Sequence, residues 1–127
     1  MRSSLVILVL SIAAVLAGCG AGHPNISSIS VSPSTASAAL NQDVVFTATG
    51  NFTNNSSRDL NAADGLSWKT SNNAIATIND NTGSATCVAP GSVTVTATAP
   101  QNLQITVNNG VSNTSTNVSG TATLNCT

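Results

Sequence analysis

The sequence predicts an all-β protein, an antiparallel sandwich of about seven short strands, and three observations lead to this class. Ser, Thr and Asn are the most frequent polar residues and Ala and Val the most frequent apolar ones, and the many β-branched residues favour strands. Glu is absent, and Lys and Arg together number only 3 of 127 residues, so the usual formers of exposed helix are scarce. Asn, Gly, Pro and Ser interrupt the apolar runs at short intervals, as turns between strands do.

The first strand is expected to be divided by a proline. Residues 26–32 alternate weakly between apolar and polar, with Ile29 and Val31 on one face. Pro33 cannot donate a hydrogen bond to a sheet ladder. We therefore expect an edge strand, or a bend between two half-strands of which the second ends at residues 39–40.

Alternation of apolar and polar residues indicates further half-buried strands along the middle of the chain. Residues 50–63 are expected to be a polar loop with Phe52 as its one apolar anchor. Asn- and Pro-containing turns separate the strands, at 41–42, 71–73, 79–83 and 90–91. The expected strands are 44–49, 66–70, 75–78, 84–89 and 93–98.

The C-terminal part is expected to hold an extended segment, residues 100–118, before the last strand. Leu103, Ile105 and Val107 alternate ahead of Asn109-Gly110, the favoured pair for a two-residue hairpin turn. Residues 111–118 either pair back across that turn or remain mobile. The last strand is expected over residues 121–126.

An apolar run from Leu5 to Ala17 follows Arg2, the single charge before Asp43. A positive start, a short apolar stretch and small residues before a cut form the secretory signal pattern. The run is shorter than the roughly 20 residues that span a bilayer. An ordinary cleaved signal with a coincidental cysteine is the alternative to the more specific interpretation that follows.

The stretch Leu16-Ala17-Gly18-Cys19 resembles the lipobox of bacterial lipoproteins. The resemblance implies a diacylglyceryl group on the Cys19 sulfur, cleavage before Cys19 and acylation of the new amino terminus, with no other cofactor. Gly20 is not the Asp that retains lipoproteins at the inner membrane, so the outer membrane is favoured in a diderm envelope. The domains would then be a cleaved signal at 1–18, a lipidated tether at 19–25 and one β-domain at 26–127.

Of the 3 cysteines, lipidation of Cys19 leaves Cys87 and Cys126 in an exported, oxidising setting. An intramolecular disulfide between them is our interpretation, and two free buried thiols are the alternative. The closed loop would stabilise the fold by about 4 kcal/mol in the chain-entropy model.

The charges exclude one class of partner. Without the signal, two basic residues face four Asp, so nothing neutralises phosphates and nucleic-acid binding is not expected. A basic cluster for anionic lipid is also absent from the sequence.

Residue types that carry chemistry are sparse, and we expect no enzyme, metal site or cofactor. His23 lies in the tether, where it cannot be held as a catalytic base. Residues 79–83 resemble a calcium loop only faintly and fit an Asx turn better. Asp59 and Asp64 are expected to be solvated loop charges, and Trp68 a core residue.

The order of the strand signals is similar to that of the bacterial immunoglobulin-like domain, group 2, over residues 26–98 and again in the last strand. Members are seven-stranded sandwiches in surface adhesins, in enzymes as accessory modules and in envelope proteins. The family usually has Gly where Asn41 stands, and a shorter connection than residues 100–118. The matching pieces are residues 29–33, Leu40, 44–50, 66–68, 71–78 and 89–97.

This resemblance implies that the strands of Cys87 and Cys126 lie in opposite sheets and meet at one end. With a short tether, that end and the turns at 41–42 and 90–91 would point away from the membrane. The expected function is a lipid-anchored envelope module for adhesion, protein–protein interaction or scaffolding, with another envelope protein or a surface polymer as partner. The alternative is a carbohydrate-binding or enzyme-accessory module, which needs exposed Phe52 and Trp68.

Overall fold

The computed structural model describes residues 24–102 and 116–127, which form ten strands and one 3₁₀ turn. Every strand is short except the last two, which make a long antiparallel pair. The elements are β1 (Ile26–Ser32), β2 (Thr35–Ala38), β3 (Asp43–Val45), β4 (Thr47–Phe52), β5 (Ser57–Asp59), η2 (Ala62–Asp64), β6 (Ser67–Thr70), β7 (Ala76–Ile78), β8 (Ser84–Cys87), β9 (Gly91–Pro100) and β10 (Asn117–Cys126).

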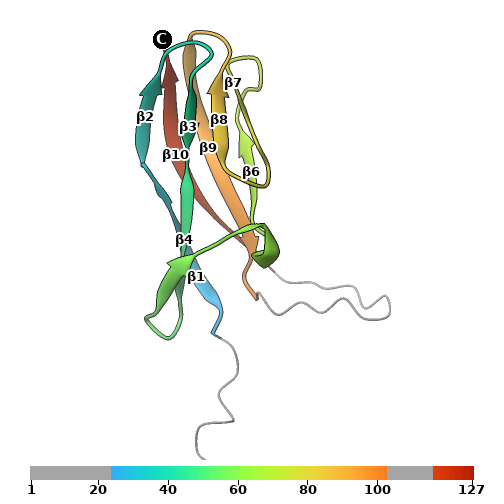
Figure 1. Cartoon of the computed structure of the whole chain (residues 1–127). Helices are drawn as coiled ribbons and strands as arrows, with labels where there is room; N and C mark the ends of the chain where they lie inside the picture. Colours follow the sequence, from blue (N-terminus) through green and yellow to red (C-terminus); the bar gives the residue numbers. More distant parts are fainter. Residues whose placement is uncertain (1–23, 103–115) are drawn as a thin grey trace, which may run out of the picture.

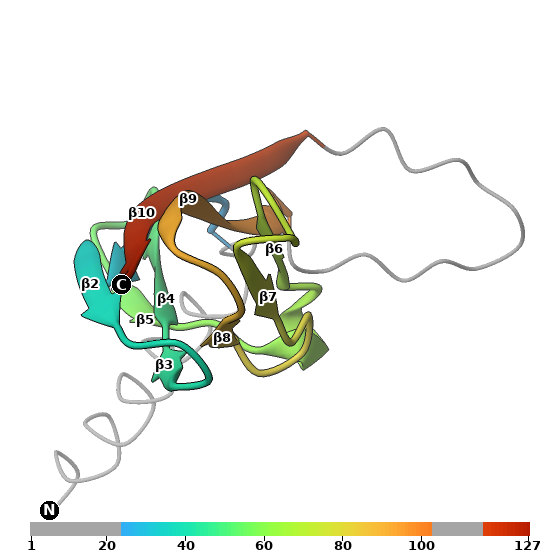
Figure 2. The same cartoon turned by 90° about the horizontal axis from the view of Figure 1, so that it is seen from above.

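The strands lie in two facing layers (Figures 1 and 2). One layer is the four-stranded sheet β2-β10-β9-β6. The other is made of two three-stranded sheets, β3-β8-β7 and β1-β4-β5, joined because β3 and β4 are one run of chain separated only at Phe46. The predicted β-sandwich is thereby confirmed. It has ten strands rather than about seven because the first expected strand is divided into β1 and β2, the second into β3 and β4, and β5 is additional.

The expected bend between two half-strands lies at Pro33, and there the chain also changes layers. β1 pairs antiparallel with β4 as far as Ser32 opposite Thr47. β2 then pairs in parallel with β10 in the other layer, beginning with Thr35 opposite Thr123. The first strand therefore contributes to both sheets.

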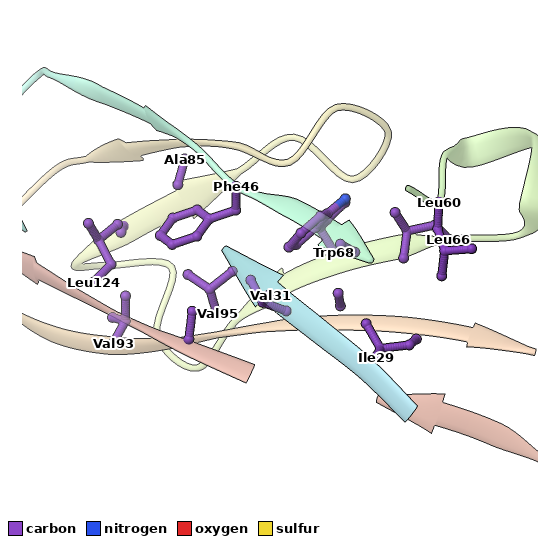
Figure 3. Packing of buried hydrophobic residues seen from close by; sticks show 14 of the residues in the cluster. Ile29, Val31, Phe46, Leu60, Leu66, Trp68, Ala85, Val93, Val95 and Leu124 are labelled. Atoms are coloured by element: carbon purple, nitrogen blue, oxygen red, sulfur yellow. The ribbon is translucent and has the colours of Figure 1, made fainter. Parts of the chain in front are cut away.

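The core lies between the layers and follows from the alternation of residues along the strands. In β9, Val93, Val95, Ala97 and Ala99 are buried, whereas the Ser and Thr residues between them face outward. Figure 3 shows the Phe46 ring pointing into this interior beside Val95 and Leu124. Seven alanines belong to the same buried core, beside larger residues such as Trp68 and Leu66.

Two expectations about the elements were wrong. Residues 50–63 are not a loop, because Gly50–Phe52 extend β4 and Ser57–Asp59 form β5. All three residues of β5 are exposed, so this strand has no buried face and no alternation to mark it. The last strand also begins earlier than expected, at Asn117. The expected hairpin around Asn109-Gly110 lies outside the described residues.

Candidate functional site

A disulfide joins the two layers at one end of the sandwich. Cys87 of β8 and Cys126 of β10 are bonded, with their Cα atoms 5.6 Å apart. Both residues are buried, and their strands belong to opposite layers. The predicted pairing is confirmed, and the alternative of two free thiols is wrong.

The same end carries the turn between β2 and β3. Asn41 has a positive φ of 66°, a conformation that Asn adopts more readily than most residues other than Gly. The Asn41 N–H donates to the Cys87 carbonyl at 2.8 Å, and the Cys87 N–H donates to the Gln42 carbonyl at 3.1 Å. The turn is thus fixed to a cystine-linked strand.

This end, which we call the cystine end, exposes apolar surface. Leu40 is 39% exposed and Val88 is 50% exposed, and the two residues flank the hydrogen bond between Asn41 and Cys87. Residues 39–42 and 88–91 carry no charge. In Figure 1 the cystine end is at the top, opposite the point where β1 begins.

The chain's three aromatic side chains are all buried. Phe46 is 1% exposed, Trp68 6% and Phe52 8%. Trp68 is the core residue that its strand position predicted (Figure 3). Binding of sugars normally uses an exposed aromatic face, so the carbohydrate-binding alternative loses the feature on which it depended.

The two acidic candidates Asp59 and Asp64 do not form a pair of catalytic acids. Arg58 donates to both Asp64 carboxylate oxygens, at 2.8 and 2.9 Å, and its guanidinium lies 5.6 Å from the centre of the Phe52 ring. The hydrogen bond from Arg58, against partial burial, lowers the pKa of Asp64. Asp59 instead accepts a hydrogen bond from the Thr49 hydroxyl at 3.1 Å.

The turn at residues 79–83 is an Asx turn, not a calcium loop. The Asn79 side chain accepts the N–H groups of Asn81 and Thr82 at 2.9 and 3.1 Å. Asp80 accepts the N–H of Trp68 on the neighbouring edge of β6, at 2.9 Å. One oxygen of this carboxylate is therefore already an acceptor. Among the described residues there is no group of three or more His, Cys, Asp or Glu side chains that could hold a metal ion.

Cys19 and His23 lie outside the described residues, so the structure leaves the lipid attachment a prediction. Within residues 24–102 and 116–127 there is no helix long and apolar enough to cross a membrane. The site features that sequence reasoning missed are the ion pair of Arg58 with Asp64 and the exposed Leu40, Val45 and Val88. Exposure of a single aliphatic residue leaves no signal in the sequence.

The layers, the divided first strand and the buried strand tryptophan define an immunoglobulin-like sandwich. Residues 25–108 match the bacterial Ig-like domain, group 2, and the chain belongs to this family. Its domains occur in bacterial surface proteins and are typically surface or interaction modules rather than enzymes. A comparison with curated proteins finds no match. The family match ends before β10, although β10 completes the four-stranded sheet.

Proposed function

We propose that this protein is a lipid-anchored interaction module of the bacterial envelope, and that its cystine end contacts another envelope protein. Family membership supports an interaction module. The observation that carries the proposal further is the position of exposed, uncharged surface around Leu40 and Val88, opposite the start of β1. A tether attached at residue 25 would hold the end at which β1 begins near a membrane, and the cystine end would point away from it.

The anchor is Cys19, which the lipobox places at the cleavage point. More than one acyl chain gives stable attachment, because each buried CH₂ contributes about 0.8 kcal/mol. Cys19→Ser should therefore leave the protein unprocessed or soluble when cells are fractionated. A variant that is fully cleaved and still membrane-bound would show that the lipid proposal is wrong.

The partner is a protein rather than a surface polysaccharide, since the aromatic side chains that would stack on sugars are buried. Exposed apolar side chains held in a rigid turn and strand favour contact with a protein, because burying them against a partner removes apolar surface from water. Leu40 and Val88 are the candidate anchors. Both an adhesive and a scaffolding role would use this contact between the cystine end and an envelope protein.

Site-specific photocrosslinking in living cells tests this assignment. A photoreactive residue is placed at Leu40 or Val88, and in a matched control at Asn54, an exposed position in the turn between β4 and β5. We expect discrete crosslinked products from the first two positions and none from the control. Products at Asn54 alone, or at no position, would count against a contact through the cystine end.

A further inference from the structure

The run formed by β3 and β4 presents alternate residues to its two sides. The main-chain N–H and C=O groups of the even-numbered residues point toward β8 or β5. The Phe46 N–H donates to the Gly83 carbonyl at 2.9 Å, and the Ala48 carbonyl accepts the Leu60 N–H at 2.8 Å. The odd-numbered residues of β4 face the other side, where β1 pairs with them as far as Thr47.

The same alternation leaves Asp43 and Val45 without a neighbour on the β1 side. Continuing the register of β1 would bring residues 34 and 36 beside them, but the chain leaves this layer at Pro33. No hydrogen bond from the main chain of Asp43 or Val45 to this side occurs within the described residues. We call these two residues the β3 edge.

The side chains of the β3 edge add an apolar and a charged group. Val45 is 61% exposed, more than any other large apolar residue of the described chain. Asp43 is exposed and accepts a hydrogen bond from the Thr86 hydroxyl. Because residues two apart share a face of a strand, the carboxylate and the valine lie on the same outer face.

The edge of β6 in the other layer is blocked. Asp80 accepts the outward N–H of Trp68, and Lys69 is exposed beside it. Folded proteins use such charged groups to prevent strands from adding to an edge. At the β3 edge, by contrast, no side chain of the described residues accepts or donates a hydrogen bond to the outward main-chain groups of Asp43 and Val45.

We propose that the β3 edge receives an extended segment of a partner protein, which adds as a strand beside β3. The segment carries a Lys or Arg opposite Asp43 and a β-branched apolar residue opposite Val45. Main-chain hydrogen bonds supply affinity in such additions, and alternate side chains supply specificity. This inference rests on the proposed interaction function, adds the β3 edge to its surface and specifies the chemistry of the partner.

A second copy of this chain fits the edge poorly. Antiparallel pairing of two β3 edges would set Asp43 opposite either the valine or the aspartate of the other copy. The first arrangement places a charge against an apolar side chain, and the second brings like charges together. A segment of another protein can instead place a basic residue opposite Asp43 and an apolar residue opposite Val45.

The test uses the full chain purified in detergent and labelled with ¹⁵N. The probes are blocked synthetic peptides, Thr-Thr-Val-Thr-Lys-Thr for antiparallel addition and Thr-Lys-Thr-Val-Thr-Thr for parallel addition, and a control of each in which Asp replaces Lys. We expect saturable amide shifts centred on Asp43 and Val45 with one Lys peptide. The Asp peptides should bind about tenfold more weakly or not at all.

Val45→Pro removes an N–H that faces outward together with the valine side chain, at a position where an edge strand tolerates proline. We expect it to abolish peptide binding while the amide spectrum of the core is kept. The matched control is Ser37→Pro in β2. The Ser37 N–H points away from β10, so removing it should leave peptide binding unchanged. Asp43→Asn should bind the Lys and Asp peptides equally.

Shifts centred elsewhere, equal binding by Val45→Pro, or no saturable binding of either Lys peptide would overturn strand addition. If Val45→Pro failed to fold, a second result could still contradict strand addition at the β3 edge. That result is an Asp43→Asn variant that prefers the Lys peptides over the Asp peptides as strongly as the wild type does. Crosslinking at Leu40 and Val88 with no peptide binding would leave the proposed interaction function standing and remove this edge from it.

Discussion

Gly120 of β10 lies directly against the main-chain carbonyl of Ile29 in β1. A Cβ atom at residue 120 would come within 2.3 Å of that oxygen, although β1 and β10 belong to opposite layers. The two strands therefore touch backbone to backbone, and β1 closes the end of the sandwich at which the described chain begins. Ile26 strengthens this closure by donating its N–H to Gln101 at 2.9 Å.

Gly120→Ala should destabilise the fold by about 3 kcal/mol, the upper part of the range for forcing an atom into a packed core. The obstacle is backbone, which cannot move aside as a flexible side chain can. Urea unfolding followed by Trp68 fluorescence measures the loss. Thr121→Ala, one residue away on the exposed face, is the control and should cost less than about 1 kcal/mol. Equal stabilities of the two variants would contradict the close approach.

Removing the disulfide should lower the free energy of unfolding by about 4 kcal/mol, from the entropy of the chain that it closes. The bonded residues are 39 apart in sequence. The measurement compares the wild type with the double variant Cys87→Ala, Cys126→Ala in denaturant. A reductant should bring the wild type close to the variant and leave the variant unchanged. If oxidised wild type and variant unfolded together, the bond would not stabilise the fold.

The sequence predicted the β-sandwich well because the alternation of apolar and polar residues along the strands reflects which side of each strand is buried. Strands with one buried face, such as β9, alternate strictly between Val or Ala and Thr. Pro33 marked the change of layer for an equally direct reason, since it cannot donate to a ladder. The register between strands depends on contacts of residues distant in the chain, and no local pattern contains it.

The candidate site was predicted less completely. The disulfide followed from the number of cysteines, and the burial of Trp68 followed from its position in a strand. β5 was missed because all its side chains are exposed. The β3 edge could not be foreseen, because its vacancy depends on where β1 stops pairing with β4.

Asp80→Ala should expose the edge of β6 and destabilise the fold by about 1–2 kcal/mol, because the Trp68 N–H loses a charged acceptor. Hydrogen exchange of the Trp68 amide should accelerate in the variant. Asp80→Asn keeps an oxygen that can accept the same N–H and should retain most of the protection. Unchanged exchange in Asp80→Ala would mean that the carboxylate does not protect this edge.

The ion pair of Arg58 with Asp64 should make stability depend on pH in the acidic range. The hydrogen bond from Arg58 is the main cause that lowers the pKa of Asp64 below its ordinary value of 3.8, and the Asn61 N–H adds to it at 3.0 Å. A carboxylate whose pKa is lower in the folded state stabilises the fold above the unfolded value. That contribution disappears as the pH falls through the folded value.

Asp64→Asn should therefore reduce the free energy of unfolding near pH 7 by less than about 1 kcal/mol, since the Arg58 side chain is 50% exposed and solvent screens the pair. The difference between variant and wild type should shrink as the pH is lowered from about 5 to below the ordinary aspartate pKa of 3.8. Asp59→Asn leaves both bonds between Arg58 and Asp64 in place and serves as the control. Urea unfolding at each pH measures the effect. A difference for Asp64→Asn that stayed constant with pH would show that the lost interaction was not ionic.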